Sequence, residues 1–532
     1  METSRNEAIS EKIKILIERF QQAEALKVHN PQEQKLEVGW GVAGLTFVYE
    51  KFRTLMDFRD EHVIRRRAIE RIFRRRVQYL KNPEDIAVPL IQELIWARYI
   101  KEDVYKSKVL EVSEIVRRYL WLIEGSGNLD RKAARKIKRF LFEMASSELE
   151  AALLPIEKER ALLSAMIEYA QEKINLSAWN LPEAQLKVQF FIACQRELFG
   201  ADHPTTFHRV FEQIYPQWFS LSKEAVPQVL AKLPELLLML ENYSSSKLVI
   251  KLSPHLRKIA ILFRFINLAI EENLGTASER LASWGSMDDS VRRHYFERDS
   301  RIRSKLRRAV IRSTAYIFLS KALLAFLVEL PYDTVFARHP GLHAIYVNVL
   351  FPPILMFLVA STVRVPNEKN IEKILEGASE ILYGPVGEKI EIQPIGKKRH
   401  PWLTSFFTII YAITFLISFG LLIWGLNLLN FSWVSGVIFL FFLCLVSFFG
   451  FRMRRTAREL LVLPKRVRWY NFIVDFFALP LLRAGQWIQQ KSAKINVFVY
   501  FMDLIVEAPF KMLVEVFEDL SKFFREKKEE IT

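Results

Sequence analysis

Residues 400–451 read HPWLTSFFTIIYAITFLISFGLLIWGLNLLNFSWVSGVIFLFFLCLVSFFGF and contain no Asp, Glu, Lys or Arg. As one helix, these 52 residues would be about 78 Å long, more than twice the roughly 30 Å thickness of a membrane's hydrocarbon core. The segment therefore has to fold back on itself, and Asn427, Asn430 and Ser432 mark a polar turn. This stretch predicts two membrane-spanning helices of about 20 residues each.

A second pair of spans is expected upstream. Residues 342–363 are apolar with few polar interruptions and are long enough to cross a membrane. Residues 313–330 are also largely apolar, although Lys321 and Glu329 interrupt them. A cluster of basic residues precedes this segment, as expected of a cytoplasmic flank, and including it makes the number of spans even. The sequence thus predicts four transmembrane helices in two hairpins.

The distribution of Lys and Arg on the short loops predicts the orientation. Basic groups precede residue 313, occupy 397–399 and follow residue 451, so all of them fall on one side of a four-span protein. The opposite side carries only Arg338. We therefore expect a multi-pass protein of the plasma or inner membrane, with both termini in the cytoplasm.

The rest of the chain shows apolar residues at three- and four-residue spacings and no sustained two-residue alternation, so the expected fold class is all-α. After the last span, residues 470–482 are apolar but too short to cross, and a re-entrant or interfacial position is expected. Residues 495–524 predict an amphipathic helix. The expected regions are a basic cytoplasmic region (1–310, with a possible sub-boundary near 125–128), a first transmembrane hairpin (311–364), a cytoplasmic loop (365–401), a second hairpin (402–451) and a cytoplasmic or interfacial C-terminal region (452–532).

Composition excludes several classes of function. Lys and Arg outnumber Asp and Glu by 76 to 60, giving a net charge of +16, which suits nucleic acid or the cytoplasmic flanks of membrane spans. The two cysteines, Cys194 and Cys444, lie in different regions, so neither a disulfide framework nor a cysteine-based zinc site is expected. The sequence has no Gly-rich phosphate loop and no nucleophile or metalloprotease motif. We expect no cofactor, and an enzyme is the least supported class.

Residues 63–77 are the most strongly basic segment outside the spans, with seven arginines and one acid, Glu70. At helical spacing the arginines and the apolar residues occupy largely separate faces, which predicts a basic amphipathic helix. Its cationic side chains could bind phosphates of lipid or RNA. They could equally pair with acidic residues of the same fold, such as Glu143, Glu148 or Glu150.

Anionic lipid headgroups are the favoured external partner of this segment, and nucleic acid is the less favoured one. Arg66 departs from the pattern because it interrupts the apolar face. A second basic segment, 131–139, leaves the same alternatives open. The candidate contacts with anionic lipid or other phosphate are Arg65, Arg66, Arg67, Arg71, Arg74, Arg75 and Arg76.

Lys321 is the most informative residue of the expected spans. It lies nine residues beyond Arg312, or about 13 Å along a helix, close to the middle of the membrane, where a lysine costs about 3 kcal/mol. Two explanations are open. The long side chain could extend back to the cytoplasmic interface, or a buried polar site could hold the ammonium group.

The second expected span offers partners for such a site. Pro352 and Pro353 remove the amides that would bond four residues back, which frees the carbonyls of Asn348 and Val349 to hold the ammonium group of Lys321. Glu329 can approach only if the first helix unwinds, because eight residues separate it from Lys321 by about 12 Å. The candidate intramembrane polar site consists of Lys321, Glu329, Asn348, Pro352 and Pro353.

Two functions remain in view. The first is a membrane-anchored helical scaffold or binding protein with a basic cytoplasmic face and no catalytic activity. Its expected partners are membrane lipid, including anionic headgroups, and a protein partner or a second copy of the chain. The alternative is a transporter or channel component that uses the polar site around Lys321 and the break at Pro352–Pro353.

Overall fold

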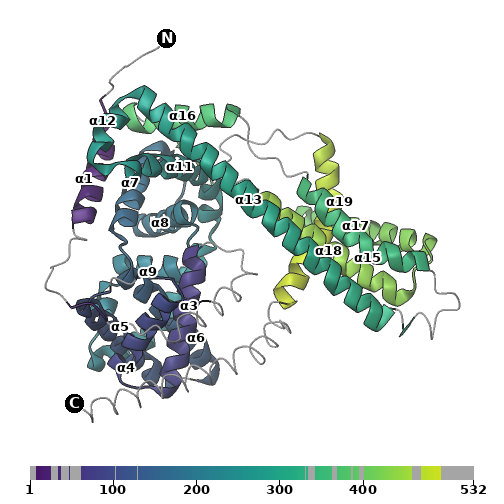
Figure 1. Ribbon diagram of the computed structural model, residues 1–532, viewed down its shortest axis with the longest axis horizontal. Helices are drawn as coiled ribbons and strands as arrows, with labels where there is room; N and C mark the ends of the chain where they lie inside the picture. The colour runs from purple at the N-terminus through teal and green to yellow at the C-terminus, as the bar shows by residue number, and fades with distance from the viewer. Residues whose placement is uncertain are drawn as a thin grey trace, which may run out of the picture. The chain divides into compact units, whose positions relative to one another are not determined.

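The computed structural model describes residues 8–25, 34–36, 47, 61–101, 104–128, 130–329, 331–332, 342–361, 368–384, 387–394, 401–457 and 469–492. Two compact units are distinguished. The first contains the residues up to Val291 together with Leu375–Ile395, and the second contains Arg292–Ile374 and Gly396–Phe510. Both are predominantly helical (Figure 1), as expected for the all-α class. The amphipathic helix expected at 495–524 lies outside the described residues.

The first unit is built mainly from α-helices, with short 3₁₀ segments between some of them. Its α-helices are α1 (Glu11–Ala25), α3 (Glu61–Tyr79), α4 (Pro83–Trp96), α5 (Lys106–Gly125), α6 (Arg131–Leu153), α7 (Glu157–Lys173), α8 (Glu183–Phe199), α9 (His203–Ile214), α10 (Val226–Ser244), α11 (Lys247–Glu272) and α12 (Ala277–Ala282). The 3₁₀ segments are η1 (Ser126–Asn128), η2 (Pro216–Ser220), η3 (Lys223–Ala225) and η4 (Leu274–Thr276).

Helix α6 packs against both α3 and α5, which positions the basic segments of α3 and α6 (Figure 1). Helix α3 buries Val63, Ile69 and Phe73 on one face, as its helical periodicity predicts. Asp130 caps α6, and Asp202 caps α9 by accepting a hydrogen bond from the backbone N–H of Thr205, which satisfies a donor that the first turn leaves free. The sub-boundary considered near 125–128 falls in the turn between α5 and α6.

Residues 375–395 return to the first unit from the segment between the two expected hairpins. They include the second half of α16 (Glu368–Tyr383) and the strand β2 (Ile390–Glu391), which pairs in parallel with β1 (Ile174–Asn175). The N–H of Ser10 also donates a hydrogen bond to the carbonyl of Leu382 at 2.7 Å. The sequence did not predict these strands, because two residues are too few to show an alternating pattern.

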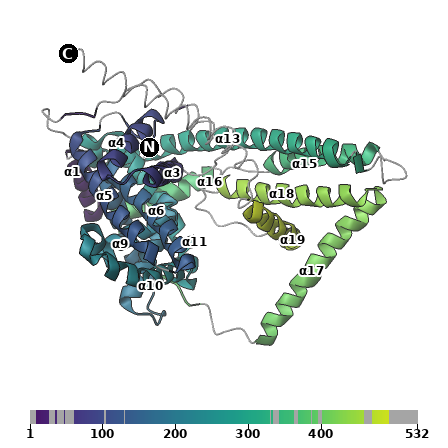
Figure 2. The same ribbon diagram turned by 90° about the horizontal axis from the view of Figure 1, so that it is seen from below.

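The second unit consists of long helices. They are α13 (Trp284–Leu324, which begins in the first unit), the π-helical turn η5 (Ala325–Glu329), α15 (Leu342–Ser361), the first half of α16, α17 (Pro401–Leu428), α18 (Trp433–Ala457) and α19 (Trp469–Ser492). Helices α15 and α18 lie side by side in both views (Figures 1 and 2), and α19 packs against α17 and α18. Helix α13 runs without a break through residue 310, where a boundary between regions was expected.

Two of the described helices are long and apolar enough to cross a membrane. They are the segments Ser405–Leu428 of α17 and Trp433–Phe451 of α18, which correspond to the expected second hairpin. The expected upstream spans coincide with α13–η5 and with α15, whose apolar part, Tyr346–Leu358, is shorter. That α13–η5 and α15 cross a membrane remains a prediction.

The region after the second hairpin is more helical than the sequence suggested. The 13-residue apolar segment expected at 470–482 belongs to α19, a helix of 24 residues that ends at Ser492. Gly485 allows α19 to approach α18 closely, because a Cβ atom at this position would lie 2.1 Å from the carbonyl oxygen of Cys444. Any larger residue must push the two helices apart.

Candidate functional site

The second unit contains a buried ion pair at the end of α13. The ammonium nitrogen of Lys321 lies 2.9 Å from Oε1 of Glu329, and both side chains are fully enclosed, with 0% exposure. The same ammonium group lies over the ring of Phe442 on α18, 5.0 Å from its centroid, a favourable cation–π geometry. The side chain of Lys321 is therefore enclosed within the second unit.

The π-helical turn explains how two residues eight positions apart can meet. An α-helix turns 100° per residue, so Glu329 would point about 80° away from Lys321. In η5 (Ala325–Glu329) the wider turn, with hydrogen bonds five residues back, reduces the rotation per residue and returns Glu329 to the side of Lys321. The helix thus departs from regular α geometry in the way that this contact requires.

Two polar residues from other helices complete the cluster. Nδ2 of Asn348, on α15, donates to Oε2 of Glu329 at 2.5 Å and to the backbone carbonyl of Ser435 at 3.3 Å. The hydroxyl of Ser435, near the start of α18, donates to Oε2 of Glu329 at 3.4 Å. Asn348 and Ser435 are buried, and Oδ1 of Asn348 has no hydrogen-bond partner among the described residues. We call Lys321, Glu329, Asn348 and Ser435 the polar cluster.

The ammonium group of Lys321 contacts the carboxylate of Glu329. Binding of this group by the carbonyls that Pro352 and Pro353 leave without amide donors stays a prediction. The two prolines are buried in the middle of α15. Lys321, Glu329 and Asn348 were expected from the sequence, whereas Ser435, three residues after Ser432 of the expected polar turn, was missed.

An apolar core surrounds the cluster on the same three helices. Ile317 of α13, Met356 of α15, and Phe442 and Val446 of α18 form one buried group. A charge in such surroundings is strongly destabilised unless it is paired and hydrogen-bonded. The ion pair therefore fixes the end of α13–η5 against α15 and α18.

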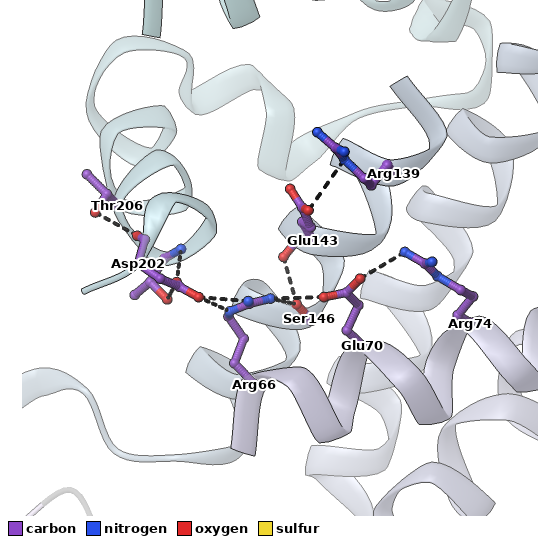
Figure 3. A network of polar contacts seen from close by, with 9 residues as sticks. Arg66, Glu70, Arg74, Arg139, Glu143, Ser146, Asp202 and Thr206 are labelled. Carbon is purple, nitrogen blue, oxygen red and sulfur yellow. Dashed lines mark hydrogen bonds and ion pairs between the residues drawn. The ribbon is translucent and has the colours of Figure 1, made fainter. Parts of the chain in front are cut away.

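A second network lies in the first unit and involves the arginines of α3 (Figure 3). Arg66 is 2% exposed. Its Nη2 lies 2.7 Å from Oδ2 of Asp202 on α9, and its Nη1 lies 2.8 Å from the hydroxyl of Ser146 on α6 and 3.3 Å from Oε2 of Glu70. The arginine that interrupts the apolar face is thus a buried connection between three helices.

Most of the other arginines of α3 also have carboxylate partners. Arg65 pairs with Glu150 at 2.7 Å, which is one of the acidic residues proposed as an internal partner. Arg74 pairs with Glu70 at 2.8 Å, and Arg75 and Arg76 both contact Glu93. Arg67 is exposed and Arg71 is half-buried. These contacts are of the kind expected if the arginines pair with acidic residues of the same fold. Binding of α3 to anionic headgroups stays a prediction.

The two acids bound to Arg65 and Arg66 differ in their electrostatics. Burial opposes ionisation of Asp202, but the charge of Arg66 and hydrogen bonds from Arg66 and Thr205 outweigh it and hold the pKa below its usual value. For Glu150, burial dominates over Arg65 and raises the pKa to about 6. Asp202 is thus the more firmly charged of the two partners.

The first unit is expected to lose stability in acid because of the buried side chain of His208 on α9. It is 2% exposed, its ring packs edge-on against Phe219, and its Nδ1 has no hydrogen-bond partner in the part of the chain that the structure describes. Burial, assisted by nearby arginines, lowers the pKa of His208 to about 3. An unfolded histidine titrates near pH 6.5, so between these pH values the unfolded chain binds a proton that the folded chain does not. Stability is therefore lost as the pH falls below about 6.5.

We expect His208→Phe to reduce this acid sensitivity. The loss attributable to His208 amounts to about 2 kcal/mol between pH 6.5 and pH 5, because each pH unit corresponds to about 1.4 kcal/mol. Thermal unfolding of the full chain in detergent at both pH values measures the difference. At pH 7.5 the histidine is neutral in both the folded and the unfolded chain and causes no acid-dependent loss of stability. The pH-dependent difference between the two proteins should therefore disappear at that pH. An equal loss of stability between pH 6.5 and pH 5 in both proteins would contradict the assignment to His208.

No protein-family model, curated protein or solved structure matches this chain.

Proposed function

We propose that the protein is a membrane-anchored helical binding protein with four transmembrane helices in two hairpins and its first unit in the cytoplasm. The observation that carries this proposal is the return of residues 375–395 to the first unit. Trp179 Nε1 donates to the carbonyl of Ile392 at 2.7 Å, and the hydroxyl of Ser10 donates to the carbonyl of Ile381 at 3.0 Å. Segments bonded in this way lie on the same side of a membrane, so the intervening chain crosses it an even number of times.

The surface of the intervening helices supports two crossings. Phe318 and Leu319 on α13 and Phe326 on η5 are exposed, as are Tyr346 and Phe357 on α15. Exposed large apolar side chains in such number are costly in water and suit lipid. The two charges that reduce the hydropathy of this hairpin, those of the polar cluster, are turned inward and paired with each other.

The first unit supplies a surface for partners. On α6, Arg131, Lys132, Arg135 and Lys138 are exposed, and none of them has a carboxylate partner among the described residues. This differs from α3, where most arginines are paired internally. The basic face that we propose for partner binding is therefore the first part of α6, opposite to its buried residues Ile137 and Phe140.

Reporter tags test the topology. Tags at Met1, between Gly384 and Gly387, and at Thr532 are expected to be cytoplasmic, and tags at Gly341 and Asn430 are expected to be outside. The basic flanks at 397–399 and after residue 451 set this orientation. Opposite locations for the tags at Met1 and Gly384 would contradict the proposal. An external tag at Thr532, with all others as expected, would make α19 a fifth span.

Crosslinking in native membranes followed by purification tests partner binding. We expect the full chain to recover a partner or a second copy of itself, and a variant with Arg131, Lys132, Arg135 and Lys138 changed to Gln to recover less of it. Because these side chains are exposed, the variant should fold normally. Full recovery by the variant would show that α6 is not the binding surface.

A second candidate function, a transporter or channel component, is supported by the polar cluster. Charged residues inside a membrane are rare, and they often mark paths for ions or protons. The π-helical turn that contributes Glu329 belongs to a class of helix irregularity that is frequent at functional sites.

A further inference from the structure

The part of α13 that precedes the first proposed span carries arginines without internal partners. After Asp299 the chain contains no acidic residue until Glu329. Arg307, Arg308 and Arg312 are exposed, and none of them has a carboxylate partner among the described residues. Three positive charges on this part of the helix are therefore not neutralised by the described part of the chain.

Helical spacing places two of these arginines in line with exposed apolar residues. Arg308, Arg312, Ala315 and Leu319 lie within about 60° of one another around the axis of α13. All four are exposed, and Leu319 is 69% exposed. Ile317, which belongs to the buried apolar group, lies on a different side of the helix. We call these four exposed residues the arginine–leucine stripe.

We propose that the arginine–leucine stripe binds an anionic phospholipid of the cytoplasmic leaflet. The phosphate group lies between the guanidinium groups of Arg308 and Arg312, and an acyl chain lies along Ala315 and Leu319. This inference rests on the proposed four-span topology, which places the residues after Arg312 in the membrane.

The spacing of the stripe fits the two parts of a phospholipid. Residues four positions apart on a helix are neighbours, with Cβ atoms about 5–6 Å apart, so Arg308 and Arg312 can approach the same phosphate. Each guanidinium group is a planar donor that matches phosphate oxygens. Leu319 lies about 10 Å beyond Arg312 along the axis, so it reaches the hydrocarbon when the arginines lie among the headgroups.

The charge of the region favours an anionic lipid over a zwitterionic one. Basic clusters on the cytoplasmic side of a transmembrane helix attract the anionic lipids of that leaflet. Phosphatidylcholine also has a phosphate, but its choline cation offsets that charge and is repelled by the arginines. Arg307 points about 100° away from Arg308, so it adds to the attraction without belonging to the stripe.

The apolar half of the stripe favours lipid over an acidic protein as the partner. Leu319 and the neighbouring Phe318 are exposed. Large apolar side chains that face water are costly, whereas acyl chains cover them favourably. An acidic protein segment could pair with the arginines but would leave these side chains uncovered. A phospholipid covers both halves of the stripe.

Quenching of a fluorophore beside the stripe tests the proposal. The fluorophore is attached to the full chain at Phe318→Cys, which leaves all four stripe residues unchanged, and Cys194 and Cys444 are buried. The protein is reconstituted with increasing fractions of brominated phosphatidylglycerol or brominated phosphatidylcholine. Phosphatidylglycerol should bind beside the fluorophore more tightly, by about fivefold for each arginine that contacts it.

Substitutions of the arginines assign the site. Changing Arg308 and Arg312 together to Gln should reduce the preference for phosphatidylglycerol to near one, and each single change should reduce it about fivefold. These side chains are exposed, so the variants should fold normally. Arg301→Gln is the matched control, because Arg301 lies on the same side of α13 but two turns before Arg308, and it pairs with Glu297. Its preference should equal that of the unmodified protein.

A second fluorophore position controls for lipid contacts in general. Leu416 of α17 is 72% exposed, and residues 401–428 contain no Lys or Arg. A fluorophore at Leu416→Cys should be quenched equally by the two brominated lipids.

Equal quenching by both lipids at Phe318→Cys in the otherwise unmodified chain would overturn the proposal. A preference for phosphatidylglycerol that survives the double substitution would do the same, and loss of a crosslinked protein from that variant would then identify a protein surface. Topology labelling separates these results from a failure of the proposed function. If the tags at Gly341 and Asn430 are external and no preference is found, the stripe is not a lipid site and the four-span proposal stands.

Discussion

Glu329→Gln is expected to destabilise the second unit by about 3–5 kcal/mol, because it leaves the charge of Lys321 buried without a counter-ion. Glutamine keeps the shape of glutamate and can still accept hydrogen bonds, so loss of the charge is the main change. Lys321 has 0% exposure and cannot reach water without disrupting the contact between α13 and α18. The effect should therefore exceed that of changing any exposed ion pair on the same helix.

A double-mutant cycle measures this contribution. Glu329→Gln and Lys321→Met each leave one charge unpaired, whereas the double variant removes both and should recover most of the stability. Unfolding of the full chain in mixed detergent, followed by the accessibility of Cys444, gives the four values. Arg301→Gln is the control, since its pair with Glu297 is exposed and 3.8 Å long. Additive effects of the two buried substitutions would show that Lys321 and Glu329 do not stabilise each other.

The second hairpin could be predicted from the sequence because its signal is long and local. The uncharged run at 400–451 determines two helices without reference to the rest of the chain, and α17 and α18 correspond to them. Lys321, Glu329 and Asn348 could be named because charged or amide groups are conspicuous in apolar segments. Their contact depends on the π-helical turn, and nothing in the residues Ala325–Glu329 indicates that turn in advance.

The first unit shows where local patterns lose their predictive value. The parallel pairing of β1 with β2 joins residues 174 and 390, and neither strand is long enough to be recognised. The partners of α3 are similarly remote, since Asp202 lies 136 residues from Arg66. Amphipathic spacing predicted that α3 would be helical and basic, but charge density alone does not distinguish an exposed arginine from a buried, paired one.

Arg66→Met should therefore destabilise the first unit by about 3–5 kcal/mol, whereas Arg67→Met should have little effect. Methionine fills much of the space of the arginine stem but leaves Asp202 without its ionic partner and Ser146 without its donor. The neighbouring residue is the matched control, because Arg67 has the same side chain on the same helix and is exposed.

Hydrogen exchange of the full chain measures the difference at the helices concerned. In the Arg66→Met protein the amides of α3, α6 and α9 should lose protection, because Arg66 connects these three helices, while α13 to α18 should exchange as before. Loss of the arginine should also raise the pKa of Asp202, because the favourable charge is removed and the burial remains. If Arg66→Met left protection unchanged but weakened binding to acidic vesicles more than Arg67→Met, Arg66 would be a headgroup contact and the structural role assigned to it would be wrong.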